Sequence, residues 1–322
     1  AVRAGKHVYL QKPASLTIAE GRRMADEVKQ SGRILQIGSQ QRGQDPWPQF
    51  HRACELVRNG RIGRLKHVEI GLPGDPSGPE APRMPIPSNL DYDAWLGTTP
   101  EVYYTETRVH PQNSFEDRPG WLRMEQFGAG MITGWGAHHV DIAHWGMDME
   151  HSGPVEIWGS AEFPKSGLWN VHGPFETHAR YANGVTMTIS GALPNGVKFI
   201  GDKGWVFVQR TGAVSSSDPS KPADVPLTAS DPGILDSVIG PNEVRLYKAP
   251  EQHRNWLDAI LKGVPVSAPA EIGHRACSTC LLHHIAMKTG RRLKWDPVSE
   301  RFIGDDAANA MLNRPQRAKY AI

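Results

Sequence analysis

The chain has 322 residues, of which 39% are hydrophobic, and a formal net charge of +2. This length allows two domains and a substantial core, and the near-neutral charge gives no argument for a nucleic acid or an anionic membrane as partner. No apolar run approaches the ~20 residues that span a bilayer. Three cysteines argue against a disulfide framework.

The first residues predict a strand followed by a helix. Residues 7–10 form the strand, and Thr17 followed by Glu20 is a capping box that opens a helix ending near Ser31. Lys12 therefore lies where the strand ends. Ligands bind at that edge of open α/β sheets, so Lys12 is a candidate for chemistry, although a solvated surface lysine would look the same.

Residues 34–39 predict a second, buried strand, and residues 50–59 predict a second helix. Together with the first strand and helix, they resemble the last part of a doubly wound domain. Gln40 and Arg42 follow the second strand, so we expect them at the same sheet edge as Lys12.

A glycine-rich turn over residues 127–136 leads into a predicted helix that contains His138, Asp141 and His144. His138 and Asp141 share one helix face, so the carboxylate can orient an imidazole whose charge changes near neutral pH. The same residues can instead pack the helix into the core, and the residues alone leave both interpretations open.

The later sequence predicts strands and two further helices. The Asn-Gly pair at residues 183–184 predicts a hairpin turn, and the Ser-, Pro- and Asp-rich residues 213–241 predict a long surface insertion. The predicted strands are 66–72, 155–163, 175–182, 185–192, 198–200 and 205–209, and the predicted helices are 252–262 and 272–289.

His274, Cys277, Cys280 and His283 form an H-x-x-C-x-x-C-x-x-H string that suggests a zinc site. A helix opposes this interpretation, because each spacing of three lags the 3.6-residue turn by about 60° and places the two histidines on opposite sides. We therefore expect a packed amphipathic helix here and no metal site.

Six segments together resemble the Gfo/Idh/MocA family, named for glucose-fructose oxidoreductase and inositol dehydrogenase. The two most specific are AGKHVYLQKP at residues 4–13 and GMITGWGAHHVDIAHWG at residues 130–146. The others are IGSQQR (37–42), FHRACELVRNGRIGRLKHVEIG (50–71), LDYDAWLG (90–97) and EIGHRACSTCLLHHIAMKTGRRLKWDP (271–297), so the resemblance covers nearly the whole chain.

The resemblance implies an α/β plus α+β fold. Residues 1–63 would be the C-terminal remnant of a Rossmann-type doubly wound domain, and residues 64–322 a substrate-binding domain with a large open, mostly antiparallel β-sheet. It also implies a homo-oligomer formed through the open sheet face. The chain looks closest to a bacterial branch whose members often carry a twin-arginine export signal, so cytoplasmic and periplasmic locations both stay open.

The resemblance also implies roles for single residues. Lys12 matches the lysine of the family's Glu-Lys-Pro motif, while His138 and Asp141 match the histidine and last aspartate of its Asp-x-Gly-x-His-x-x-Asp motif. These three would be catalytic. Gln11 and Gly134 replace the acidic residues that begin the two motifs, and we expect Asp141 to compensate for the lost carboxylate.

The implied reaction is hydride transfer from a sugar or polyol to NAD or NADP, with Lys12 or His138 as the base. The implied cofactor-binding residues are Gln11, Lys12, Pro13, Gln40 and Arg42, and the implied substrate-binding residues are Arg118, Trp135, His139 and His172.

Two other functions stay open: a glycosidase- or lyase-type enzyme that uses transient oxidation by a tightly held NAD, and a non-catalytic carbohydrate-binding module. No strand, Gly-x-Gly-x-x-Gly turn and helix precede Lys12, and the chain begins with Ala1. We therefore expect a fragment of a longer protein whose nucleotide fingerprint lies upstream.

Overall fold

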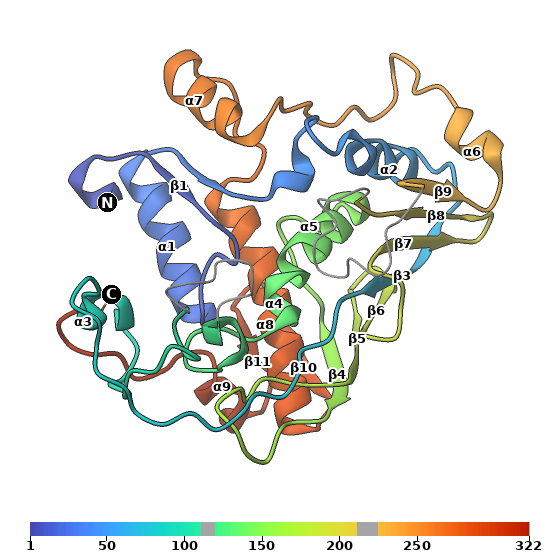
Figure 1. The fold of residues 1–322 in the computed structure, drawn as a ribbon. Coiled ribbons are helices and arrows are strands. Elements are labelled where there is room, and N and C mark those ends of the chain that lie inside the picture. Colours follow the sequence, from blue (N-terminus) through green and yellow to red (C-terminus); the bar gives the residue numbers. More distant parts are fainter. Residues whose placement is uncertain (111–119, 211–224, 322) are drawn as a thin grey trace.

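A computed structural model describes residues 1–110, 120–210 and 225–321 of the chain, in which helices lie between a small and a large sheet (Figure 1). The small sheet is a parallel pair of β1 (Val8–Leu10) and β2 (Leu35–Ile37), connected through α1 (Ile18–Ser31). This unit confirms the predicted strand–helix–strand order. Its membership of a larger doubly wound domain stays a prediction.

The predicted capping box fixes the start of α1. The backbone N–H of Glu20 donates to Thr17 Oγ1 at 3.2 Å, and the backbone N–H of Thr17 donates to the Glu20 carboxylate at 3.1 Å. Two backbone donors that the first helical turn leaves unsatisfied are paired in this way.

The large sheet has nine strands in the described residues, in the order β11-β10-β4-β5-β6-β3-β7-β8-β9. Only the β3–β6 pair in this order is parallel, so the predicted mostly antiparallel sheet is confirmed. The strands are β3 (Leu65–Gly71), β4 (Glu156–Ala161), β5 (Phe175–Arg180), β6 (Thr186–Ser190), β7 (Gly196–Gly201), β8 (Trp205–Val208), β9 (Leu227–Ala229), β10 (Leu293–Asp296) and β11 (Arg301–Phe302).

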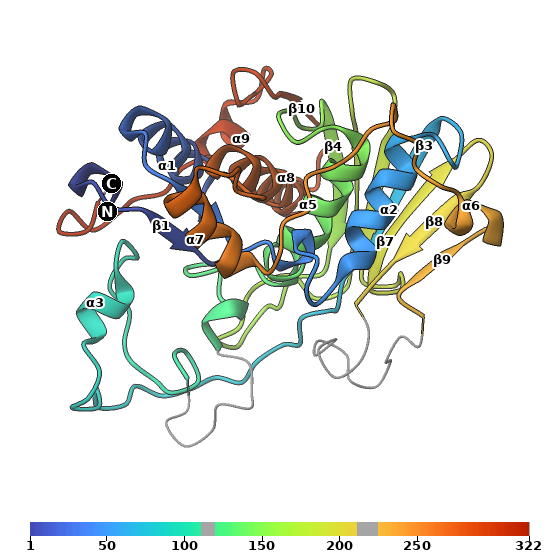
Figure 2. The same ribbon diagram turned by 90° about the horizontal axis from the view of Figure 1, so that it is seen from above.

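Side chains alternate between the two faces of this sheet. In β5, Phe175, Thr177 and Ala179 are buried, whereas Glu176 and Arg180 are exposed. Helices α2, α5 and α8 lie along one face of the sheet (Figure 2). The strands therefore bury one row of side chains under the helices and present the other row on the opposite face.

Small residues let the helices approach the sheet and each other closely. A Cβ atom at Gly146 of α5 would lie 2.6 Å from the Phe199 ring of β7, and one at Gly136 would lie 3.2 Å from Cys280 Sγ of α8. The remaining helices are α2 (Pro48–Arg58), α3 (Tyr92–Leu96), α4 (Met131–Gly134), α5 (Gly136–Met147), α6 (Pro232–Asp236), α7 (Gln252–Lys262), α8 (Ala270–Thr289), α9 (Asp306–Ala310) and the 3-10 turns η1 (Val2–Ala4), η2 (Gln40–Arg42) and η3 (Gly120–Arg123).

All three cysteines are free thiols buried in this helical layer. Cys54 lies in α2, and Cys277 and Cys280 lie in α8. Burial raises the pKa of each thiol, so the reactive thiolate is scarce at neutral pH.

The sequence analysis misses several short elements. Strands β10 and β11 and helix α9 follow residue 290, and β9 and α6 lie inside the predicted 213–241 insertion. Each is only two to five residues long, too short for a hydrophobic period to show. Residues 213–224 of the insertion lie outside the described part of the chain.

The chain returns to the small sheet just before α8. The Ile37 backbone N–H donates to the Ala268 carbonyl at 2.8 Å, and the Gln36 side-chain amide donates to the Gln252 carbonyl at 2.8 Å. Contacts therefore cross the predicted domain boundary at residues 63/64, which stays a prediction. No helix in the described residues is both long and apolar enough to cross a bilayer.

Histidines in and beside α5 and α8 are held in the neutral form. Burial is the largest cause and disfavours the imidazolium ion in each case. It lowers the pKa of His138 well below its ordinary value, that of His139, His144 and His283 to about 3, and that of His172 and His284 to about 4.

We expect thermal stability to fall on acidification from about pH 7 to about pH 5. Unfolded histidines bind protons below about pH 6.5 while the folded ones stay neutral, so each costs at most about 1.4 kcal/mol per pH unit in this window. Thr177 donates its hydroxyl proton to the Trp158 carbonyl, and its oxygen lies 2.9 Å from His283 Nδ1; His283→Asn keeps an amide that can donate to this oxygen. In calorimetry, the Tm of this variant should fall less steeply than that of the wild type as the pH is lowered from 7 to 5. An equal dependence of Tm on pH would show that His283 does not contribute to the loss of stability.

Candidate active site

Lys12 lies directly after β1, as predicted. Its Nζ donates to the carbonyl oxygen of Gly134, the last residue of α4, at 2.7 Å. Gln40, in η2 after β2, donates from Nε2 to Gln11 Oε1 at 3.4 Å. Gln11, Lys12 and Gln40 therefore meet at the carboxyl edge of the small sheet, and Pro13 follows Lys12 through a cis peptide bond.

His138 lies in the first turn of α5 and is only 4% exposed. In the described part of the structure neither of its ring nitrogens makes a hydrogen bond, and Nδ1 is fully buried. The other buried histidine rings do have partners: His51 with Leu246, His139 with Asn195, His144 with Tyr181, His172 with Gly173, His274 with Glu300 and His283 with Thr177. Among the buried histidines of the described residues, His138 is thus the one whose ring makes no hydrogen bond.

The surroundings of His138 keep its ring neutral. Burial lowers its pKa most, and the nearby positive charges of Lys12 and Arg210 lower it further. A neutral imidazole without a partner can accept a proton or a hydrogen bond from a ligand.

Asp141 is bound to Arg42, not to His138. Arg42 donates from Nε and Nη2 to the two Asp141 oxygens at 2.7 and 2.8 Å, and from Nη1 to Glu150 at 2.6 Å. Arg42 is 2% exposed, and its guanidinium carbon lies 4.8 Å from the centre of the Trp145 ring. Burial lowers the pKa of Arg42, but the two carboxylates raise it by more, so the ion pair stays charged.

This ion pair corrects three expectations. Arg42 is enclosed by protein and its donors are occupied, so it is not available to a cofactor. Asp141 neither orients His138 nor compensates for the carboxylate that Gly134 lacks. The i, i+3 spacing of His138 and Asp141 is real, but Arg42 offers the carboxylate a planar, bidentate cation from another element.

Trp135 and His139 lie beside His138, together with an arginine that the sequence analysis misses. The Trp135 ring centre is 5.9 Å from that of His138 and 5.3 Å from that of His139. Arg210, just after β8, lies between the rings of Trp135 and Trp47, at 4.6 and 3.9 Å from their centres. The position of Arg210 directly after the predicted strand 205–209 was a weak indication of a site residue. Its contacts with the rings of Trp47 and Trp135 could not be predicted from the sequence.

His172, another predicted substrate residue, packs elsewhere. His172 is completely buried, its ring lies 4.5 Å from that of Phe175, and its Nδ1 lies 3.2 Å from the Gly173 carbonyl. None of these contacts is with Lys12, His138 or Arg210, so a substrate role for His172 stays a prediction that this geometry does not support. Arg118 lies outside the described residues.

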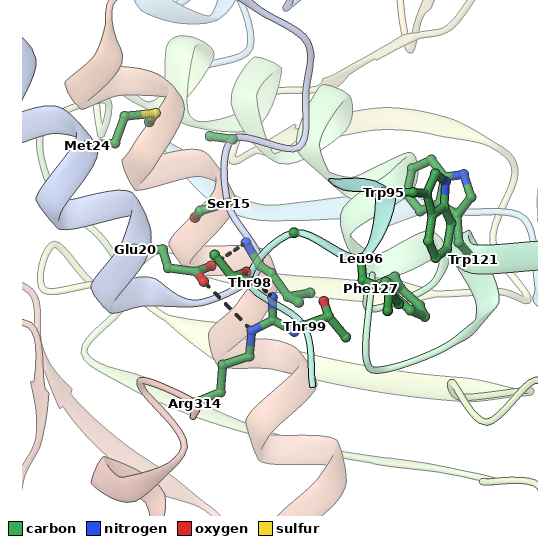
Figure 3. A pocket seen from close by; sticks show the side chains of 13 residues that line it. Ser15, Glu20, Met24, Trp95, Leu96, Thr98, Thr99, Trp121, Phe127 and Arg314 are labelled. Atoms are coloured by element: carbon green, nitrogen blue, oxygen red, sulfur yellow. Dashed lines mark hydrogen bonds and ion pairs between the residues drawn. The ribbon is translucent and has the colours of Figure 1, made fainter. Parts of the chain in front are cut away.

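A cavity of about 560 Å³ lies beside the loop that follows Lys12 (Figure 3). Trp95, Trp121 and Phe127 gather at one end, and Glu20 and Arg314 form an ion pair at the other. Neither Lys12 nor His138 lines it. The cavity therefore adjoins the segment that follows Lys12, through residues 14–16, and is separate from the side chains of Lys12 and His138.

The histidine–cysteine string of α8 does not converge on one point. His274 contacts Glu300 at 2.8 Å, whereas His283 contacts Thr177 of β5 at 2.9 Å. Among the described residues, no group of three or more histidine, cysteine, aspartate or glutamate side chains is arranged to hold a metal ion.

Comparison with known proteins identifies the family. A model described as the C-terminal alpha/beta domain of the Gfo/Idh/MocA oxidoreductase family matches residues 77–218 and 239–322. The chain belongs to this family. Its motifs at Lys12 and His138 had implied the same family, and that prediction is confirmed. A comparison with curated proteins finds no match.

Solved structures share the fold at low sequence identity. An aldose-aldose oxidoreductase from Caulobacter crescentus in complex with glycerol has a TM-score of 0.58 and 19% identity, over 91% of this chain and 73% of the other. The WlbA dehydrogenase from Bordetella pertussis, in complex with NADH and UDP-GlcNAcA, has a TM-score of 0.57 and 14% identity, over 92% and 73%. An NAD-binding protein from Listeria innocua has a TM-score of 0.55 and 17% identity, over 91% and 73%.

We expect Asp141→Asn to lower the free energy of unfolding by about 3 kcal/mol, because it leaves part of the Arg42 charge buried without its partner. The matched control is Asp148→Asn at the end of the same helix. Asp148 is 70% exposed at its side chain and pairs with Arg58 at 2.9 Å, so its loss should cost less than about 1 kcal/mol. Equal Tm values for the two variants would rule out a stabilising role for the buried pair.

Proposed function

We propose that the protein is an NAD(P)-dependent oxidoreductase that oxidises a hydroxyl group of a sugar or polyol. The observation that carries this proposal is the neutral, unpaired His138 beside Lys12, in a chain that belongs to an oxidoreductase family. Similar folds occur in proteins whose structures contain NADH or glycerol, which supports this cofactor and substrate class.

The residues at the small-sheet edge fit one end of such a cofactor. The amide groups of Gln11 and Gln40 and the amine of Lys12 can pair with the carboxamide of a nicotinamide. The β1–α1 connection, residues 11–17, contains no glycine, so it does not provide the close backbone approach that a pyrophosphate needs. Gln11, Lys12 and Gln40 would therefore hold the nicotinamide end.

Oxidation of an alcohol removes a hydride from carbon and a proton from oxygen. A bound nicotinamide supplies the hydride acceptor. His138, whose ring has no partner in the described structure, would accept a hydrogen bond from the hydroxyl and take its proton as the hydride leaves. Lys12, held by the Gly134 carbonyl, places a positive charge beside the oxygen and favours loss of its proton. Trp135 and His139 would line the substrate side of this site.

We expect Lys12→Met and His138→Asn each to reduce kcat by about 10² to 10⁴, the usual contribution of general acid–base catalysis. Lys29→Met, at an exposed position of α1, is the matched control and should leave kcat unchanged. The measurement is NADH formation by the full-length protein with a panel of sugars and polyols. A kcat within a few-fold of the wild type in both site variants would contradict the catalytic roles of Lys12 and His138.

The same assay separates the two alternatives. Turnover without net NADH would indicate transient oxidation, as in a glycosidase- or lyase-type reaction. Sugar binding that persists in the Lys12→Met/His138→Asn double variant, with no turnover by the wild type, would indicate a non-catalytic module.

We also propose a homo-oligomer that forms through the sheet face opposite α2, α5 and α8. Thr188 of β6 belongs to the row that alternates onto this face, since Met187 and Ile189 are buried on the other. Light scattering after size exclusion should show an oligomer for the wild type and a monomer for Thr188→Arg. A monomeric wild type would overturn this proposal.

A further inference from the structure

Arg210 is held in one orientation by three side chains. Its guanidinium carbon lies 3.9 Å from the centre of the Trp47 ring and 4.6 Å from that of Trp135. With the Gln41 amide assigned in the orientation that satisfies both of its ends, its side-chain oxygen accepts from Arg210 Nε at 3.1 Å. The amide nitrogen of the same Gln41 donates to the His138 carbonyl at 3.1 Å. Two rings and one acceptor therefore hold Arg210, and no hydrogen bond within the described residues uses its Nη1 or Nη2.

The charge of Arg210 has no counterpart in the described residues. No carboxylate forms an ion pair with it there, and burial lowers its pKa to about 10. The nearest titratable partners of His138 are also cationic or neutral: Lys12, Arg210 and His139. Asp141, the one acidic residue of α5, is already neutralised by Arg42.

Three other arginines of the described residues are stacked on tryptophans. Arg42, on Trp145, pairs with Asp141 and Glu150, and Arg292, on Trp158, pairs with Glu156 at 2.8 Å, whereas Arg123, on Trp169, pairs with no carboxylate there. Arg210 resembles Arg123 in this respect, but its positive charge acts on His138, beside Lys12. A half-buried cation that lacks a counter-charge is stabilised when an anion arrives.

We propose that Arg210 binds the carboxylate of an acidic sugar whose hydroxyl faces Lys12 and His138, so that the substrate is a uronic or related sugar acid. The inference rests on the proposed oxidoreductase function and specifies its substrate class. The planar Nη1–Nη2 edge matches a carboxylate with two parallel hydrogen bonds, and the tryptophan rings fix the plane in which the carboxylate must lie. Arg210 is thus a specificity-determining residue.

The test compares acidic and neutral sugars of the same ring. D-Glucuronate and D-glucose, and D-galacturonate and D-galactose, are titrated into the purified protein by calorimetry, with intrinsic fluorescence as a second readout because Trp47 and Trp135 flank the site. The wild type should bind each acid at least about tenfold more tightly than its neutral counterpart.

Arg210→Met keeps the apolar stem between the rings and removes the charge. It should weaken binding of the acid by about 10- to 100-fold and leave the neutral sugar within about twofold. Arg210→Lys keeps the charge without the planar edge and should restore only part of the discrimination. Arg292→Met is the matched control, a stacked arginine on the open sheet, and should change neither affinity.

Three results would overturn the inference. They are equal binding of acid and neutral sugar by the wild type, an unchanged ratio in Arg210→Met, and a loss of NAD⁺ affinity in Arg210→Met with sugar binding intact, which would assign Arg210 to a cofactor phosphate. If neutral sugars are nevertheless oxidised with NADH formation, the oxidoreductase proposal stands without this inference. Selective binding of acidic sugars without NADH formation would support a carboxylate site at Arg210 and contradict the proposed oxidoreductase function.

Discussion

The buried ion pair of Arg42 with Asp141 and Glu150 is the contact on which the arrangement of the site depends. Arg42 ends η2, next to the small sheet, whereas Asp141 lies in the middle of α5, which packs on the large sheet. Arg42 also donates to the Ser267 carbonyl at 3.2 Å, in the segment that leads into α8. One guanidinium therefore joins three separate stretches of chain, and a bidentate pair tolerates little sliding or rotation of α5.

This constraint determines where His138 lies relative to Lys12. Lys12 follows a strand of the small sheet, whereas His138 lies in α5, which packs on the large sheet, so the position of α5 brings the two residues together. Lys12 contacts the same region through the carbonyl of Gly134, a position at which the motif resemblance implies an aspartate. A backbone carbonyl orients the amine but adds no negative charge, so the site is left with Lys12, Arg210 and a neutral histidine. The Asp141 carboxylate pairs with Arg42 and is therefore not available to a ligand.

Much of the fold could be predicted from neighbouring residues in the sequence. The arrangement of the candidate site could not, because it depends on contacts between residues far apart in the chain. The Thr17–Glu20 capping box, the Asn183-Gly184 turn and helix α7 over residues 252–262 follow from neighbouring residues and are confirmed. Lys12 at a strand end was also readable. The partner of Asp141 was not, because the i, i+3 neighbour His138 is visible in sequence while Arg42, 99 residues away, is not. Arg210 needed the positions of Trp47 and Trp135, which only the folded chain supplies.

The buried thiols allow the opening of the helical layer to be measured without introducing a new cysteine. Cys54 Sγ donates to the Ile142 carbonyl of α5 at 3.6 Å, and Cys280 of α8 lies against Gly136 at the start of the same helix. Alkylation of these groups requires α5 to separate from its neighbours, so the rate of modification reports how often the layer opens. Mass spectrometry of the modified peptides would resolve the α2–α5 seam, at Cys54, from the α5–α8 seam, at Cys280. The chain thus carries its own probes for the movement of the helix that bears His138.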